Sequence, residues 1–414
     1  MKKQIFTGAI TLAAIGAVSA QGLYDVAPND EAKESLPIKW SAGVSVTYDD
    51  NVTPTVQGGS GFEDESISIN AYVGAAFVSV TPQTTWDVYA RVGGIFYVDE
   101  LEAAGSDDIF GQGRLGVNWA HRVSERLRFS SRNYVAYELE PDFNQGITTD
   151  RQLGEYLNYQ SDNAVGYRWS ERFATYTGIR VSGIVFDDDF DGNDRFTYGA
   201  YNQFRYRATE QTVWTLDYRY RETDSDGTAG DSTNQFITLG VEHRYSPNSV
   251  LAVKAGVQIR DVDGGDDSNS PFVEAAIRTR VNEQFSFRAF ARYSVEDFGT
   301  SFADHTFDTN NTLRIGFTAN YIVSHRLSLN AGLNYIRLDQ EDGRFVFGPD
   351  VDDFEQDIIN LFVGFSYKLQ ENVFLTGSYN FTDSDGSGGE PTGNIADSRT
   401  YNRNRVTLGI DVEF

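Results

Sequence analysis

Residues 85–98 read Thr85-Trp86-Asp87-Val88-Tyr89-Ala90-Arg91-Val92-Gly93-Gly94-Ile95-Phe96-Tyr97-Val98. One register carries Trp, Val, Ala, Val, Gly, Phe and Val, whereas the other carries Asp, Tyr, Arg, Gly, Ile and Tyr. A two-residue period that separates apolar from polar side chains is typical of a β-strand with one face in an apolar environment. The alternation continues for about ten to fourteen residues, which is enough for a tilted strand to cross a bilayer.

The same alternation recurs along the chain. Residues 285–295, 313–323 and 406–414 carry aliphatic or aromatic side chains at one register and mainly Arg, Ser, Thr, Asn, Gly or acidic side chains at the other. Aromatic residues make up 14% of the chain, and 39 Gly stand against 9 Pro and 1 Met. This composition favours strands and turns over helices.

Short polar turns recur at a spacing of roughly forty residues. Between two turns lies a longer segment rich in Asp, Gly, Ser, Asn and Thr, with an alternating run on each side, so each period predicts one hairpin. Counting these hairpins predicts an all-β transmembrane antiparallel up-and-down barrel of about 18 strands (16 to 18), with short periplasmic turns and long acidic extracellular loops. The turns are residues 81–83, 123–125, 170–172, 208–210, 246–248, 282–284, 324–326 and 370–372.

Two features leave alternatives open at this point. A β-propeller blade also repeats at about forty residues, but its strands are shorter than these runs. The run from Tyr156 to Trp169 loses its alternation at Ser161 to Asn163, which makes the strand count uncertain by about two.

The first residues have the form of an export signal. Lys2 and Lys3 precede an apolar run over residues 5–18, and the small residue Ala20 precedes an expected cleavage before Gln21. We predict a signal peptide over 1–20, a short periplasmic segment over 21–36 and a barrel over 37–414. The alternative is an uncleaved helical anchor, which the shortness of the run disfavours.

Composition also bears on the partners. The chain has no cysteine, which suits passage through an oxidising compartment. A formal net charge of -26 argues against nucleic acid or anionic lipid as a partner, because like charges would have to be brought together. Mean hydropathy is low, at -0.41, as expected when only every second strand residue faces lipid.

Tryptophans lie near the short turns or the chain start. An indole prefers the membrane interface, where the ring is half buried and its N–H stays hydrated. The tryptophans therefore predict an aromatic girdle at the periplasmic side of the membrane. A second girdle at the opposite side would include Phe96, Tyr137, Phe196 and Tyr220. The alternative is that these aromatics form the core of an ordinary β-sandwich, but core aromatics would not cluster at one end. The predicted tryptophan girdle is Trp40, Trp86, Trp119, Trp169 and Trp214.

Charges are divided between loops and strands. Asp and Glu gather in the longer loops, whereas arginines occupy the polar strand register, and a charge facing lipid at the bilayer midplane would cost about 2 to 4 kcal/mol. The arginines are therefore predicted to line a wet lumen. There they either sort solutes by charge or merely stiffen the wall by pairing with luminal acids such as Asp87, Asp217, Glu274 and Glu296. The predicted pore-lining set is Arg91, Arg114, Arg128, Arg132, Arg168, Arg180, Arg205, Arg207, Arg219, Arg221, Arg288, Arg292 and Arg314; Arg278 and Arg280 share the pattern.

Two short motifs resemble a known group. The opening run from Leu36 to Val52 contains Tyr48-Asp49-Asp50-Asn51, which resembles the first strand of β-barrel porin families of bacterial outer membranes. Phe414 ends an alternating apolar register, which is similar to the C-terminal signal read by the barrel-assembly machinery. The resemblance implies a porin-like fold and role in the outer membrane and gives no substrate.

Reactive and metal-binding motifs are sparse. His121, His243 and His325 lie near turns, and His305 with Asp304 and Asp308 is weak support for a hydrolase, so no enzyme and no cofactor are expected. Asp187-x-Asp189-x-Asp191-Gly192 copies half of a calcium loop, but Tyr198 replaces the bidentate Glu, leaving at most weak loop calcium binding.

These features predict a passive diffusion channel for small hydrophilic solutes. An 18-strand barrel is too wide for its own side chains to fill, and residues 21–36 are too few for the plug of an energy-coupled transporter. The alternative is a barrel-anchored structural or adhesive surface protein whose acidic loops bind a partner or calcium. Outer-membrane lipid and the assembly machinery are expected partners, and the oligomeric state stays open.

Overall fold

The computed structural model describes residues 38–52, 65–98, 109–139, 155–186, 194–226, 230–263, 267–296, 301–302, 305–345, 351–389 and 399–414. The predicted signal peptide and the segment 21–36 lie outside these residues. No helix among the described residues is long and apolar enough to span a membrane. The strands are β1 (Lys39–Asp49), β2 (Ser66–Val80), β3 (Thr84–Tyr97), β4 (Ile109–Arg122), β5 (Leu127–Glu138), β6 (Tyr156–Arg168), β7 (Phe173–Phe186), β8 (Arg195–Arg207), β9 (Thr212–Ser225), β10 (Ser232–Ser246), β11 (Ser249–Val262), β12 (Ser268–Arg280), β13 (Phe285–Val295), β14 (Ser301–Phe302), β15 (His305–Ile322), β16 (Leu327–Phe345), β17 (Phe354–Gln370), β18 (Val373–Gly388) and β19 (Tyr401–Glu413).

The strands form one closed antiparallel ring. β1 pairs with both β2 and β19, so that Val44 lies opposite Ala71 on one side and Ile410 on the other. β14 pairs only with one end of β15, while β13 pairs with β15 directly, so the wall has 18 strands. The predicted fold and strand count are confirmed. Despite its polar residues, the run through Ser161 forms one continuous strand, β6.

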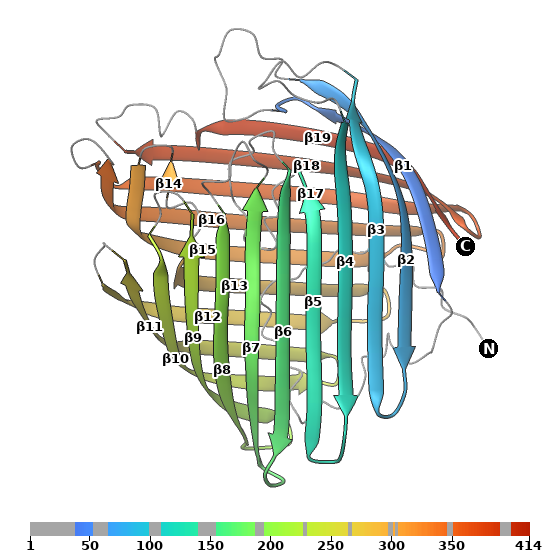
Figure 1. The fold of residues 1–414 in the computed structure, drawn as a ribbon. Helices are drawn as coiled ribbons and strands as arrows, with labels where there is room; N and C mark the ends of the chain where they lie inside the picture. The colour runs from blue at the N-terminus through green and yellow to red at the C-terminus, as the bar shows by residue number, and fades with distance from the viewer. Residues whose placement is uncertain are drawn as a thin grey trace.

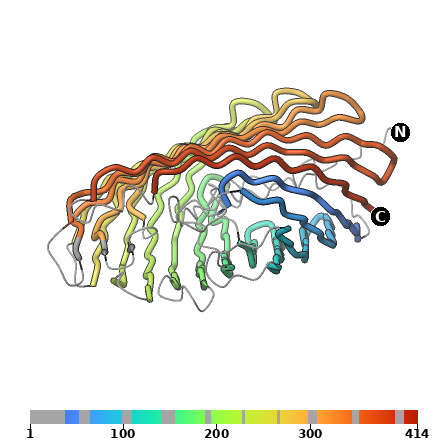
Figure 2. The backbone as a smooth tube through the Cα atoms, turned by 90° about the horizontal axis from the view of Figure 1, so that it is seen from above, coloured from blue at the N-terminus to red at the C-terminus, as the bar shows by residue number. Residues whose placement is uncertain are grey.

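The two halves of the wall lie on opposite sides of the ring. In Figure 1 the strands β2 to β8 run up and down in front of β15 to β19, which run across the view. The two sets cross because every strand of a closed barrel is tilted to the barrel axis. Figure 2 shows the ring from above as a flattened outline, with the orange and red strands along one side and the blue and green strands along the other.

Several of the short turns share one local structure. In the turn after β4, the Ser124 hydroxyl accepts a hydrogen bond from the backbone N–H of Leu127 at 3.1 Å. Ser170, Ser324 and Asn282 accept the equivalent bond at 3.1, 3.1 and 2.8 Å. A side-chain oxygen at this position satisfies a backbone donor that the tight turn leaves without a partner, which is why Ser and Asn recur there. We call this end of the barrel the short-turn end and the opposite end the long-loop end.

The seam of the ring joins the two ends of the described chain. Trp40 and Phe414 exchange backbone hydrogen bonds of 2.8 and 2.9 Å at the short-turn end. Further along the seam, the hydroxyls of Thr47 and Thr407 lie 2.8 Å apart. Sheet pairing therefore continues around the wall without a free edge, which is what a bilayer demands of β-structure.

Candidate functional site: the inner face of the barrel

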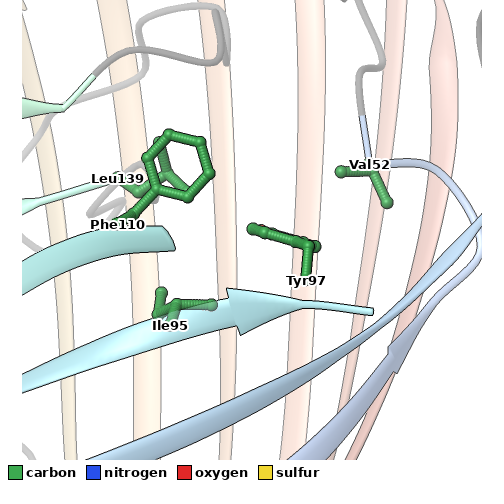
Figure 3. Close-up of a cluster of buried hydrophobic side chains, with 5 residues drawn as sticks. All are labelled: Val52, Ile95, Tyr97, Phe110 and Leu139. Carbon is green, nitrogen blue, oxygen red and sulfur yellow. The ribbon is translucent and has the colours of Figure 1, made fainter. Parts of the chain in front are cut away.

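The strand register separates an outer face from an inner one. Figure 3 shows Tyr97, Phe110 and Leu139 directed into the ring, with strands of the far wall behind them. Together with Val52 and Ile95 they form a buried apolar cluster at the long-loop end. Residues at the same register as Tyr97 and Phe110 therefore face inward. Most of those at the other register, such as Val92, are exposed and apolar, as a lipid-facing belt requires.

Cross-strand pairing places every arginine of the predicted pore-lining set on this inner register. Arg91 on β3 lies opposite Arg114 on β4, so both face the same way. The same pairing, followed from strand to strand, places the arginines of the set on β5 to β9 on this face as well, ending with Arg219 and Arg221. Arg288, Arg292 and Arg314 occupy the same register on β13 and β15. The arginines thus follow the wall from β3 to β15.

Several of these arginines have acidic partners. Arg180 donates two hydrogen bonds to Asp162, at 2.6 and 3.2 Å, and the hydroxyl of Tyr201 donates to the other oxygen of that carboxylate at 2.7 Å. Arg205 makes a two-pronged ion pair with Glu242, at 2.7 and 2.5 Å. The side chains of both partners in this second pair are less than a tenth exposed, at 2% and 9%.

Two more carboxylates connect neighbouring strands. Asp217 accepts a hydrogen bond from Gln203 at 2.5 Å and lies 3.4 Å from the ammonium nitrogen of Lys254. Glu296, just beyond the end of β13, accepts from Arg314 at 2.6 Å and also from Arg292. The sequence indicated Asp217 and Glu296 as luminal acids. It did not single out Asp162 or Glu242, although both stand at the arginine register of their strands.

Other arginines have no carboxylate within ion-pair distance among the described side chains. Arg91 lies over the ring of Tyr72, with 3.5 Å between the guanidinium carbon and the ring centroid, and Arg219 lies over Phe272 at 5.2 Å. Arg91 is also exposed although it faces inward, so solvent reaches this face. The arginines without such a partner include Arg91, Arg128, Arg132, Arg219 and Arg288.

Some arginines directly oppose one another on adjacent strands. Like charges at opposed positions destabilise a sheet unless another group compensates them, as Glu296 does between Arg292 and Arg314. Four such pairs stand on the inner face: Arg91 with Arg114, Arg122 with Arg128, Arg278 with Arg288, and Arg292 with Arg314.

The rest of the inner wall, from β16 around to β2, is mainly neutral and polar. Asn360 donates to Thr382 at 2.9 Å and to Asn380 at 3.2 Å. Charged side chains on this part of the wall include Asp411, which accepts hydrogen bonds from Tyr72 and Thr376. The inner register is therefore asymmetric: arginines recur on it from β3 to β15, and amide and hydroxyl side chains predominate on the rest. The inner register of residues 327–345 already carries Ser328, Asn330 and Asn334, which was the available sequence signal.

The tryptophans of the predicted girdle take outer positions. Trp40, Trp86, Trp169 and Trp214 are each at least two-fifths exposed, and Trp119 lies 5.8 Å from Trp86, ring centre to ring centre. The indole N–H of Trp169 donates to Thr175 at 3.0 Å. All five lie near the short-turn end, and Phe414 is exposed at the same end.

The metal-binding and catalytic candidates of the sequence lie largely outside the described residues. Among the residues that are described, no group of three or more His, Asp or Glu side chains is arranged to hold a metal ion. Residues 187–193 of the calcium-like segment, and Asp304 beside His305, lie outside the described residues, as do most of the acidic loops. Near the short-turn end, His121 and His243 contact Thr84 and Thr212 at 2.8 and 3.0 Å.

A closed 18-strand antiparallel wall with an apolar outer belt and a polar interior is the architecture of the porin-like β-barrels of bacterial outer membranes. The β-barrel class expected from the sequence is thus confirmed.

No protein-family model matches the sequence, and no curated protein matches it. Similar solved structures include OpdK of Pseudomonas aeruginosa with vanillate, which is 10% identical over 92% of this chain and 100% of that chain, with a TM-score of 0.48. OccAB4 of Acinetobacter baumannii is 11% identical over 92% and 99%, with a TM-score of 0.44. The siderophore receptor PirA of Pseudomonas aeruginosa is 9% identical over 92% and 81%, with a TM-score of 0.41. These likenesses concern the fold alone.

Proposed function

We propose that the barrel is a passive diffusion channel for small hydrophilic solutes and that its Arg-lined wall favours anionic ones. The observation that supports this function is the set of inward arginines without a carboxylate partner, together with the opposed arginine pairs. Fixed positive charge along a wet wall raises the local concentration of anions and lowers that of cations.

The asymmetry of the lumen suits a solute with a charged end and a hydroxylated body. A carboxylate would exchange between successive guanidiniums, which offer paired N–H donors in a planar fork. The amide and hydroxyl side chains of β16 to β18 would meet the rest of the solute. Because guanidiniums such as Arg91 remain exposed, each contact is weak enough to be released. We propose neither a catalytic step nor a bound cofactor for this function.

Planar-bilayer recording tests the proposal. The purified barrel should give stepwise conductance, and in a salt gradient its reversal potential should lie on the anion-selective side. Replacing Arg132, Arg219 and Arg288 together by Gln should move the reversal potential toward zero while leaving the steps. Arg337→Gln is the control, because Arg337 stands at the outer register and pairs with Glu355 at 2.7 Å.

Two results would contradict this function. An unchanged reversal potential in the triple variant would show that the arginines only stiffen the wall. A folded barrel without conductance steps would instead favour the alternative, a barrel that anchors acidic loops for a partner or calcium. Calcium calorimetry on the same preparation then measures whether those loops bind the ion.

A further inference from the structure

The outer face carries one polar region within its apolar belt. We define the outer polar patch as Ser131 and Asn133 on β5, Ser161 and Asn163 on β6, Thr177 on β7 and Asn202 on β8. Pairing register places all of them outward, since each stands at the register opposite to the inward Arg132, Asp162, Arg180 or Arg205. The interruption in the alternation at 161–163 is therefore a change in what faces the membrane.

The patch lies at a depth where the other strands are uniformly apolar. Ser131 follows the first residue of β5, Leu127, by four positions, and Ser161 precedes the last residue of β6, Arg168, by seven. At outward positions in this interval from the short-turn end, the remaining wall strands carry only Ala, Val, Leu, Ile, Gly, Phe or Tyr. Val44, Leu239, Val363 and Leu408 are examples.

Four members of the patch close a ring of hydrogen bonds. Ser131 donates to Asn163 at 2.7 Å, and Asn163 donates to Ser161 at 2.8 Å. Ser161 donates to Asn133 at 2.7 Å, and Asn133 donates back to Ser131 at 2.9 Å. The ring is neutral, and each amide in it both donates and accepts. It lowers the cost of placing these groups in the membrane but does not remove it.

The side-chain oxygen of Asn202, at the same depth, has no hydrogen-bond donor among the described residues. The amide nitrogen of Asn202 donates to Thr177 at 2.6 Å, while its Oδ1 atom is shielded from solvent and has no partner among the described residues. Lipid tails offer no hydrogen-bond donor at this depth. Exchanging the oxygen and nitrogen of the amide would leave an N–H group unmet instead. Each polar group at this depth adds to the cost of facing lipid, and contact of the patch with another protein surface would lower that cost.

We propose that the outer polar patch is the contact between two copies of this chain, related by a two-fold axis along the membrane normal. A second copy is held at the same depth by the same tryptophan girdle, so its patch meets this one level with it. Side chains that both donate and accept are self-complementary, which a two-fold contact requires. The short Ser, Thr and Asn side chains also let the two walls approach closely, as small residues do between membrane segments.

The molecular mass of the protein particle in mild detergent tests this contact. The wild type should be a dimer, and a variant with Asn133→Leu, Asn163→Leu and Asn202→Leu should be a monomer, its dissociation constant raised at least about tenfold. Heat-dependent gel mobility shows whether the variant is a folded barrel. If the wild type is itself monomeric, or if the folded variant stays dimeric, the proposed contact is wrong.

Cross-linking in native membranes gives a second measurement that does not depend on the leucine variants. Since the chain has no cysteine, Ser161→Cys introduces a single thiol in the patch. Ala331→Cys on β16 is the matched control at the same depth interval on another part of the wall. A flexible bis-maleimide should yield dimers from Ser161→Cys and none from Ala331→Cys. Equal yields, or a product containing a different protein, would overturn the proposal.

Discussion

Arg205 on β8 and Glu242 on β10 form a bidentate ion pair that bridges the intervening strand β9. Because both side chains are buried, removal of one partner leaves an uncompensated charge. Glu242→Gln should therefore lower the free energy of unfolding by about 3 to 5 kcal/mol. Denaturant titration in detergent micelles measures this change.

A matched control is available on the outer face. Arg337 and Glu355 form an ion pair of similar length, 2.7 Å, but their side chains are 41% and 48% exposed. Glu355→Gln should lower the free energy of unfolding by only about 0 to 1 kcal/mol. Similar losses in the two variants would show that burial does not set the energy of the inner pair. Replacing both Arg205 and Glu242 by Met should recover much of the loss.

Glu296 makes stability depend on pH. Burial by itself raises the pKa of this carboxyl, but the guanidiniums of Arg314 and Arg292 outweigh burial and lower the pKa to about 2 from an ordinary value of 4.5. The folded state therefore gains on the order of 3 kcal/mol from ionised Glu296 above pH 4.5, and this gain disappears as the pH falls toward 2.

Thermal unfolding between pH 6 and pH 2 checks this dependence. The wild type should lose stability progressively below about pH 4.5, whereas Glu296→Gln should be less stable at pH 6 and should change less over the same interval. Parallel curves for the two proteins would mean that other acids carry the acid sensitivity.

Gly178 makes room for an aromatic ring on the next strand. Tyr201 lies directly opposite on β8, and a Cβ atom at residue 178 would lie 2.7 Å from its ring carbon Cε1. In Gly178→Ala the new methyl group must displace the ring of Tyr201, whose hydroxyl donates a hydrogen bond to Asp162. The substitution should therefore lower the free energy of unfolding by about 1 to 3 kcal/mol. The measurement is the free energy of unfolding of the refolded barrel.

Gly113→Ala is the control for that substitution. Gly113 is also within a strand, but a Cβ atom there meets only the carbonyl oxygen of Arg91 at an ordinary 3.7 Å. Its stability should stay the same or rise by about 0.5 to 1 kcal/mol, because alanine restricts the unfolded chain. If Gly178→Ala were as harmless as Gly113→Ala, the ring packing would contribute nothing.

The architecture was readable from the sequence because strand period and turn chemistry are local. The alternation over 85–98 fixes which residues share a face, and turn residues such as Ser124 and Ser170 fix where hairpins reverse. Together they set the order of the strands around the ring. For the same reason the register of the arginines follows from the sequence.

Partner choice across strands could not be read in this way. Whether Arg205 meets Glu242 or Asp217 depends on stagger between strands and on side-chain reach. The polar residues at 161–163 raised doubt about a strand, because their hydrogen-bond partners stand on β5, about thirty residues earlier in the chain. Only the assembled sheet brings Ser131 and Asn163 together.

The seam between β1 and β19 determines when the barrel can be completed during biosynthesis. Thr47 and Thr407, whose hydroxyls touch across it, are 360 residues apart, so this pairing has the longest sequence separation in the wall and is slow to form. Until the last strand has been synthesised and exported, β1 and β18 each present a row of unsatisfied peptide groups. If synthesis stopped before residue 401, the chain would lack β19 and could not close into a barrel that is stable in the bilayer. Such a chain would instead be bound by periplasmic chaperones or degraded by proteases.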